Sequence, residues 1–219
     1  MGTITRTFAN NITTSGVFKP TAFNNASFDN VTSVPSGAVE GGSMVLLSTQ
    51  TASGSSSISF TTGIDSTYKE YMFIFNNIHP ATNGTYFQFN LSTDGGSNYN
   101  VTKTTSFFQA RHNEADTETS LSYMTGNDLA QSTSYQRVSH STRNDSDTCY
   151  SGNFFLYNPS STTFVKHFIA NGSSVDDQSS NISDFMAGYA NTTSAINAID
   201  FKMSSGNIDD GTIQMFGIL

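Results

Sequence analysis

The feature that most constrains the fold is a series of short segments in which apolar and polar residues alternate. The clearest is "YKEYMFIFNNI" at 68–78, which places Phe73 and Phe75 on one side of an extended chain and Met72 and Ile74 on the other. Alternation with a period of two is the pattern of a β-strand. Because both sides of this segment are apolar, we expect a central strand that is buried on both faces.

Turn-forming clusters separate these segments along the chain. "DGGSN" at 94–98 is one of them, and its Asp-Gly pair predicts a hairpin turn. About ten or eleven short strands with turns between them are typical of two packed antiparallel sheets. The sequence therefore predicts an all-β fold, an antiparallel β-sandwich or jelly roll over residues 44–219.

The composition supports an ordered β-protein rather than a disordered chain. Charged residues make up only 12% of the sequence, and Ser, Thr and Asn replace them. Disordered segments are poor in aromatic residues, whereas this chain has 18 Phe and 9 Tyr. Each buried Phe can contribute roughly 1.5–3 kcal/mol to a core.

The first part of the chain differs from the rest. Residues 1–36 are predicted to form an extended arm for assembly or anchoring, and residues 37–43 a linker rich in Gly. Phe8, Phe18, Phe23 and Phe28 follow a spacing of five or ten residues, which neither a helix nor a strand explains.

Pentapeptide-repeat β-helices have this five-residue spacing, but the arm is too short to stack the several coils that such a solenoid needs. Two interpretations remain: the arm lies on a neighbouring subunit, or three copies wind around a threefold axis. A chance spacing is the alternative to both, because the chain is rich in Phe.

Charge and motif content exclude several classes of function. The net charge of −8 argues against nucleic-acid binding, because phosphate contacts need clustered Lys and Arg. No run approaches the ~18 apolar residues of a membrane span, and the opening segment has no secretory signal. The one cysteine, Cys149, allows no intrachain disulfide and is expected to be a small buried apolar residue.

The sequence contains no recognisable catalytic or cofactor motif. The 4 His residues are too far apart in sequence for a local metal-binding pattern, so neither a metal nor another cofactor is expected. Asp145 and Asp147 alternate in a loop and could hold a hard cation, but a solvated loop is favoured. Tyr99, Tyr123 and Tyr135 are candidates for glycan-facing aromatic side chains, since sugars pack against aromatic rings.

Three stretches resemble structural proteins of tailed bacteriophages, particularly marine phages that infect cyanobacteria. "MGTITRTFANNITTSGVF" with "FNNASFDNVT" is similar to their N-terminal segments. "YKEYMFIFNNIHPATNGTYFQFNLSTDGGSNY" is similar to a β-sandwich module of fibre and appendage proteins, and "SGNIDDGTIQMFGI" to its closing strand. The resemblance implies no catalytic residues.

The expected function is therefore that of a non-enzymatic virion structural protein, a short tail-fibre or knob-type subunit. The resemblance implies a place on the virion surface after assembly in the host cytoplasm. Expected partners are further copies of the chain in a homotrimer, other tail or capsid proteins, and a host surface glycan. A capsid decoration protein is the alternative, and an envelope-polysaccharide depolymerase is the third possibility.

Overall fold

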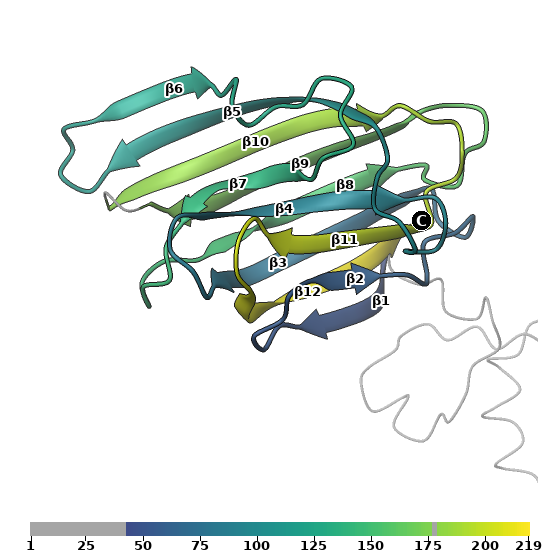
Figure 1. Ribbon diagram of the computed structural model, residues 1–219, viewed down its shortest axis with the longest axis horizontal. Helices are drawn as coiled ribbons and strands as arrows, with labels where there is room; N and C mark the ends of the chain where they lie inside the picture. The colour runs from purple at the N-terminus through teal and green to yellow at the C-terminus, as the bar shows by residue number, and fades with distance from the viewer. Residues whose placement is uncertain (1–42, 177–178) are drawn as a thin grey trace, which may run out of the picture. The chain divides into compact units, whose positions relative to one another are not determined.

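The computed structural model describes residues 43–176 and 179–219. Within these residues every named strand pairing is antiparallel, and there is no helix (Figure 1). The strands form two sheets that pack face to face, which confirms the predicted all-β sandwich. The predicted arm, and the predicted linker up to its last residue, lie outside the described residues.

The two sheets differ in size. The large sheet has eight strands, in the spatial order β1 (Met44–Thr51), β12 (Ile208–Ile218), β3 (Glu70–Pro80), β8 (Tyr150–Tyr157), β9 (Lys166–Val175), β10 (Ser180–Ala190), β5 (Lys103–Asn113) and β6 (Thr119–Tyr123). The small sheet has four strands, in the order β2 (Ile58–Phe60), β11 (Ala198–Met203), β4 (Thr85–Ser92) and β7 (Gln136–Thr142).

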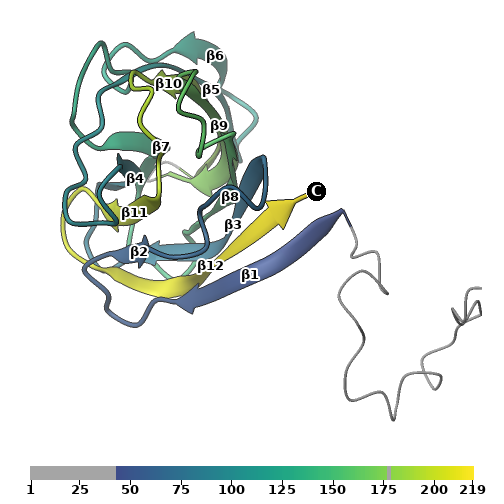
Figure 2. The ribbon, with the colours of Figure 1, turned by 90° about the vertical axis from the view of Figure 1, so that its right-hand side faces the viewer.

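The large sheet curves around the small one. Figure 2 shows this curve from β6 at one end to β1 at the other, with the small sheet facing its inner side. Three pairings are nested in sequence: β3 with β12, β4 with β11, and β5 with β10. The chain is therefore closed by contacts between residues far apart in sequence, a topology that folds slowly.

Aromatic side chains fill the space between the sheets. Phe73 and Phe75 of β3 point inward together with Phe87 and Phe89 of β4, and all four are at most 1% exposed. Phe201 of β11 lies among them, with ring centroids 5.1 Å from Phe75 and 5.5 Å from Phe73. The Phe201–Phe75 pair packs edge to face, a favourable arrangement for aromatic rings at this distance.

The other side of β3 corrects one prediction. Met72 and Ile74 were expected to be buried, but both are only partly buried, because they lie on the outer face of the large sheet. The small sheet covers only one of the two faces of β3. The apolar outer side of β3 therefore lies at the surface of the sandwich rather than in its core.

The turn at 94–98 also differs from its prediction. It connects β4 in the small sheet to β5 in the large sheet, so it is not a hairpin turn. Asp94 organises it: the side chain of Asn98 and the hydroxyl of Ser92 donate to its carboxylate at 2.7 Å each. These hydrogen bonds, that of Asn98 first, lower the pKa of Asp94 to about 2. An Asp-Gly pair specifies a turn but not which strands pair beside it.

Cys149 is a third correction. It is only partly buried, immediately before β8, and its Sγ lies 3.8 Å from Oδ1 of Asn77. Its neighbours Thr148 and Tyr150 point inward instead. Alternation along the strand therefore moves the cysteine out of the core.

Candidate functional site

The predicted assembly residues Phe8, Phe18, Phe23 and Phe28 lie outside the described residues. Their role in assembly stays a prediction. The three predicted glycan-facing tyrosines are all described, and the structure places them in two separate regions.

Tyr99 and Tyr135 meet at the outer face of the small sheet, around Asp200 of β11. The hydroxyl of Tyr135 donates to Oδ2 of Asp200 at 2.8 Å, and the hydroxyl of Ser59 donates to Oδ1 at 2.5 Å. Asp200 is only 3% exposed. Burial, followed by this hydrogen bond, raises the pKa of Tyr135, while burial is the main cause of the raised pKa of Tyr99.

Two cations of the chain lie over aromatic rings of this face. Lys202 Nζ lies 4.0 Å from the ring centroid of Tyr135, and Arg137 Cζ lies 3.7 Å from that of Tyr86. The quadrupole of each ring attracts the cation that lies over its face. One side of each ring is therefore already used within the chain, which leaves only the other side for a sugar. Glycan binding by Tyr99 and Tyr135 stays a prediction.

Tyr123 lies far from this network, on β6 at the edge of the large sheet. It is 54% exposed, and its hydroxyl donates to Oδ2 of Asp128 at 2.7 Å. Its partner across the sheet is Phe108, whose ring stacks on Phe185 with centroids 4.9 Å apart. Leu121, 74% exposed, lies on the same strand. Tyr123 therefore lies in an exposed apolar cluster apart from Tyr135, and glycan binding by Tyr123 also stays a prediction.

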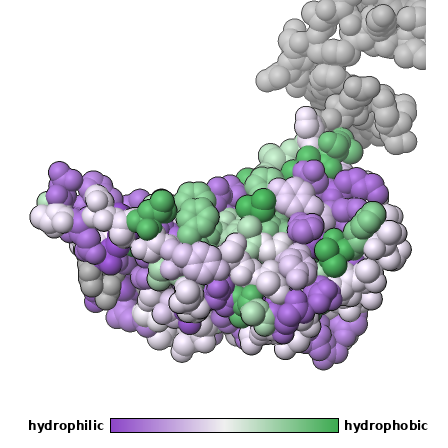
Figure 3. Space-filling model, turned by 90° about the horizontal axis from the view of Figure 1, so that it is seen from above, coloured by the Kyte–Doolittle hydropathy of each residue, from purple (hydrophilic) through white to green (hydrophobic). Residues whose placement is uncertain are grey.

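The outer face of the large sheet carries a continuous line of apolar side chains, here called the apolar row. Strand register places one such residue opposite the next across six neighbouring strands. Its members are Leu46, Phe216, Met72, Phe155, Ile169 and Ala187. Figure 3 shows hydrophobic side chains among polar ones at the surface of the molecule. Leu46 is 52% exposed and Ile169 46%, which is high for residues of this size.

The positions beside the apolar row are almost free of charge. On one side lie Met44, Ile218, Glu70 and Tyr157, and on the other Thr49, Gln214, Ile74, Asn153, Asn171, Phe185 and Phe108. Glu70 is the only charged side chain in these rows. Depletion of charge with enrichment of aromatic residues and Met is the composition of an interface centre.

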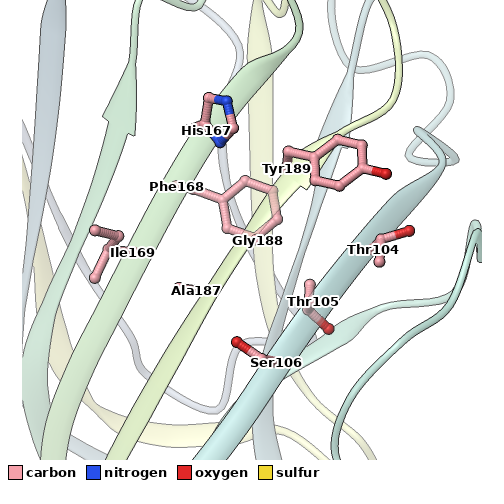
Figure 4. Close-up of a pocket in the computed structure, with 9 residues that line it drawn as sticks. All are labelled: Thr104, Thr105, Ser106, His167, Phe168, Ile169, Ala187, Gly188 and Tyr189. Atoms are coloured by element: carbon pink, nitrogen blue, oxygen red, sulfur yellow. The ribbon is translucent and has the colours of Figure 1, made fainter.

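An open hollow lies at one end of the apolar row (Figure 4). Its volume is about 560 Å³, and it lies over Ala187 and Gly188 between segments of β5, β9 and β10. Tyr189 and His167 line it, with ring centroids 6.1 Å apart. A side chain at Gly188 would come within 2.6 Å of the carbonyl oxygen of Thr104, so this position requires Gly. The hollow offers shape and apolar surface but no paired acid and base.

No group of three or more His, Cys, Asp or Glu side chains that could hold a metal occurs in 43–176 and 179–219. Asp145, for which the sequence favoured a solvated loop over a cation site, pairs with Arg143 at 3.0 Å. No helix among the described residues is long and apolar enough to cross a membrane.

Comparison with known proteins gives no relative: no family model, curated protein or solved structure matches this chain. Its function must therefore be inferred from its own residues and their arrangement.

Proposed function

We propose that this protein is a non-enzymatic structural subunit of the bacteriophage virion surface, a short tail-fibre or knob-type subunit that assembles as a homotrimer. The observation that carries the proposal is the apolar row on the outer face of the large sheet. The resemblance of three sequence stretches to phage structural proteins supports the virion location. An assembly role needs a broad, weakly charged surface, and this face has both properties.

The dimensions of the row suit a subunit interface. Six strands at a spacing of about 4.8 Å extend over roughly 24 Å. A stable interface of ordinary size buries about 800 Å² on each partner, and a patch of this width can supply that area. Phe155, Phe216 and Met72 lie near the middle of the row, where interface residues contribute most to affinity.

The small sheet would then face outward, toward solvent and the host surface. Its polar groups already bind one another, as Asp200 binds Ser59 and Tyr135. Such a surface remains soluble when the opposite face is covered by neighbouring subunits. A host glycan is the partner proposed for this side, with Tyr99 and Tyr135 at its centre.

The arm is proposed to reinforce the same assembly. Phe18, Phe23 and Phe28 need an apolar partner, which neighbouring subunits can provide. Replacing all three with Ser in the full chain should lower the oligomer mass in solution or weaken association. An unchanged oligomer would remove the arm from assembly while leaving the proposal for the apolar row intact.

Location on the particle is tested by labelling. Gold-tagged antibodies against the purified protein, applied to intact phage particles, should mark the tail in electron micrographs. Label over the head would show the alternative, a capsid decoration protein. Absence of the protein from purified particles, checked by mass spectrometry, would contradict both. New reducing ends after incubation with host polysaccharide would contradict the non-enzymatic part of the proposal.

A further inference from the structure

Four polar side chains point into the sandwich from four neighbouring strands of the large sheet. They are Gln109 on β5, Tyr150 on β8, Ser174 on β9 and Asp184 on β10, and none is more than 6% exposed. Each has one buried oxygen for which the described residues provide no hydrogen-bond partner: Gln109 Oε1, Tyr150 Oη, Ser174 Oγ and Asp184 Oδ1. Buried polar atoms in native proteins are almost always hydrogen-bonded, so these four need an explanation.

Strand register brings the four side chains together. Asp184 is the direct partner of Gln109 on one side and of Gly172 on the other. The hydroxyl of Tyr150 occupies the space where a side chain at Gly172 would lie, so it reaches the position beside Asp184. Ser174 is the cross-strand partner of Tyr150. The four oxygens therefore belong to one cluster that spans four neighbouring strands.

Strand β7 of the small sheet approaches this cluster from the opposite side. The backbone N–H of His140 donates to Oδ2 of Asp184 at 2.6 Å, which leaves Oδ1 as the carboxylate oxygen without a partner. Burial raises the pKa of Asp184 to about 7, and burial together with the Asp184 charge raises that of Tyr150. Both shifts agree with a site enclosed by protein.

The chemistry of the four atoms limits what can bind there. Tyr150 and Ser174 carry hydroxyls that both donate and accept, while the carboxylate and amide oxygens of Asp184 and Gln109 accept. Water matches this mixture, because each molecule donates two hydrogen bonds and accepts two. A calcium ion would need six to eight oxygen ligands, usually several of them carboxylates, and this cluster has one carboxylate.

We propose that the cluster of Gln109, Tyr150, Ser174 and Asp184 is an internal water-binding site that links β5, β8, β9 and β10 beneath β7. The bound water completes the hydrogen bonds of these four side chains. Gly172 leaves room for this arrangement, because a larger residue there would push the Tyr150 hydroxyl out of the cluster. Ordered water of this kind is part of a native fold rather than solvent that has entered by chance.

A high-resolution crystal structure of the full chain tests this directly. We expect density for at least one water within about 2.6–3.2 Å of two or more of the four oxygens. Direct hydrogen bonds among the side chains, with no such density, would overturn the proposal. Density with six or more oxygen ligands at about 2.3–2.6 Å would overturn it in favour of a cation.

Solution measurements separate water from a cation independently. The thermal midpoint of the wild type should be unchanged when EGTA is added or when choline chloride replaces sodium chloride at equal ionic strength. A lower midpoint in either medium would contradict a water site. In crystals of Tyr150→Phe, which keeps the ring and removes the hydroxyl, the water should lose one partner or be displaced; an unaltered water peak with the same number of partners would place it outside the cluster.

Discussion

The two outer faces of the sandwich are built from the same kind of alternating strand but differ in the side chains that they present. On the small sheet, the outward side chains bind each other and the loops: Tyr135 binds Asp200, and Lys202 covers Tyr135. On the large sheet, the outward side chains of the apolar row, such as Leu46 and Phe155, are apolar and are not fully buried. From this difference we propose that the chain itself holds most of the outward polar groups of the small sheet, whereas another subunit covers the apolar row.

Loops contribute to this difference. The side chain of Asn90 on β4 donates to the backbone oxygens of Tyr99 at 2.6 Å and Thr133 at 2.9 Å. These bonds hold two connecting segments against the small sheet. The four-stranded sheet is thereby partly covered by its own chain, while the apolar row crosses the middle of a much wider sheet.

The largest expected effect comes from placing a charge in the apolar row. Phe155→Asp should weaken self-association about a thousandfold, or about 4 kcal/mol, because a carboxylate without a partner would be buried in the interface. Light scattering at micromolar concentration measures the mass. Gln88→Asp on the outward side of β4 is the matched control and should keep the wild-type mass. Equal dissociation of both variants would remove the distinction between the faces.

The second effect concerns the interior that both faces enclose. Burial raises the pKa of Asp184 to about 7 from the ordinary value of 3.8, so Asp184 binds its proton more tightly in the folded protein. The free energy of unfolding should therefore fall by about 2–4 kcal/mol as the pH rises from about 4 to about 7. His140 of β7 and Tyr150 of β8 are the neighbouring titratable groups.

Urea unfolding across this pH range measures the effect, with Asp184→Asn as the comparison. The variant should lack the decline that Asp184 causes, so the difference between the two proteins should grow with pH. Parallel profiles for wild type and variant would show that Asp184 ionises with its ordinary pKa.

The third effect tests whether hydrogen bonds on the outer face of the small sheet stabilise the fold. Asp200→Ala removes the acceptor of Ser59 and Tyr135 and should lower the free energy of unfolding by about 1–3 kcal/mol. Gln214→Ala, outward on β12, should change it by less than about 0.5 kcal/mol. Chemical denaturation of both variants measures the two changes in the free energy of unfolding. A larger decrease for Gln214→Ala than for Asp200→Ala would contradict the view that the outer face of the small sheet is the one stabilised by its own hydrogen bonds.

The smallest effect is that of the cation above Tyr135. Lys202→Gln keeps most of the side chain but removes its charge, and it should cost about 0.5–1 kcal/mol. Thermal unfolding in low and high salt measures this cost. No change on substitution would mean that Lys202 lies over the ring without stabilising it.

The sequence predicted the core more accurately than the surfaces. Alternation correctly assigned Phe73 and Phe75 to the interior, because the period of a strand fixes which residues share a face. It could not show that the small sheet covers β3 on one side only, so Met72 and Ile74 were wrongly expected to be buried. That outcome depends on the number of strands in each sheet, which no local pattern encodes.

The site was predictable only in part, because it depends on strand register. The apolar row joins residues such as Leu46 and Ile169 through pairings between distant segments. The buried charges also escaped prediction: Lys103 points inward, and its Nζ donates to Asn90 Oδ1 at 2.5 Å and to the Val101 oxygen at 2.8 Å. A single Lys in a polar strand segment does not indicate that the fold will place hydrogen-bond acceptors around its side chain.

The central claim, that the outer face of the large sheet is covered in the assembled protein, is tested most directly by thiol labelling. Met72→Cys and Gln88→Cys, each in a Cys149→Ser background of the full chain, place one thiol on each face. At micromolar protein concentration the thiol at position 72 should react at least about tenfold more slowly than the thiol at position 88, and dilution into monomers should remove the difference. Equal reaction rates at high concentration would contradict the account.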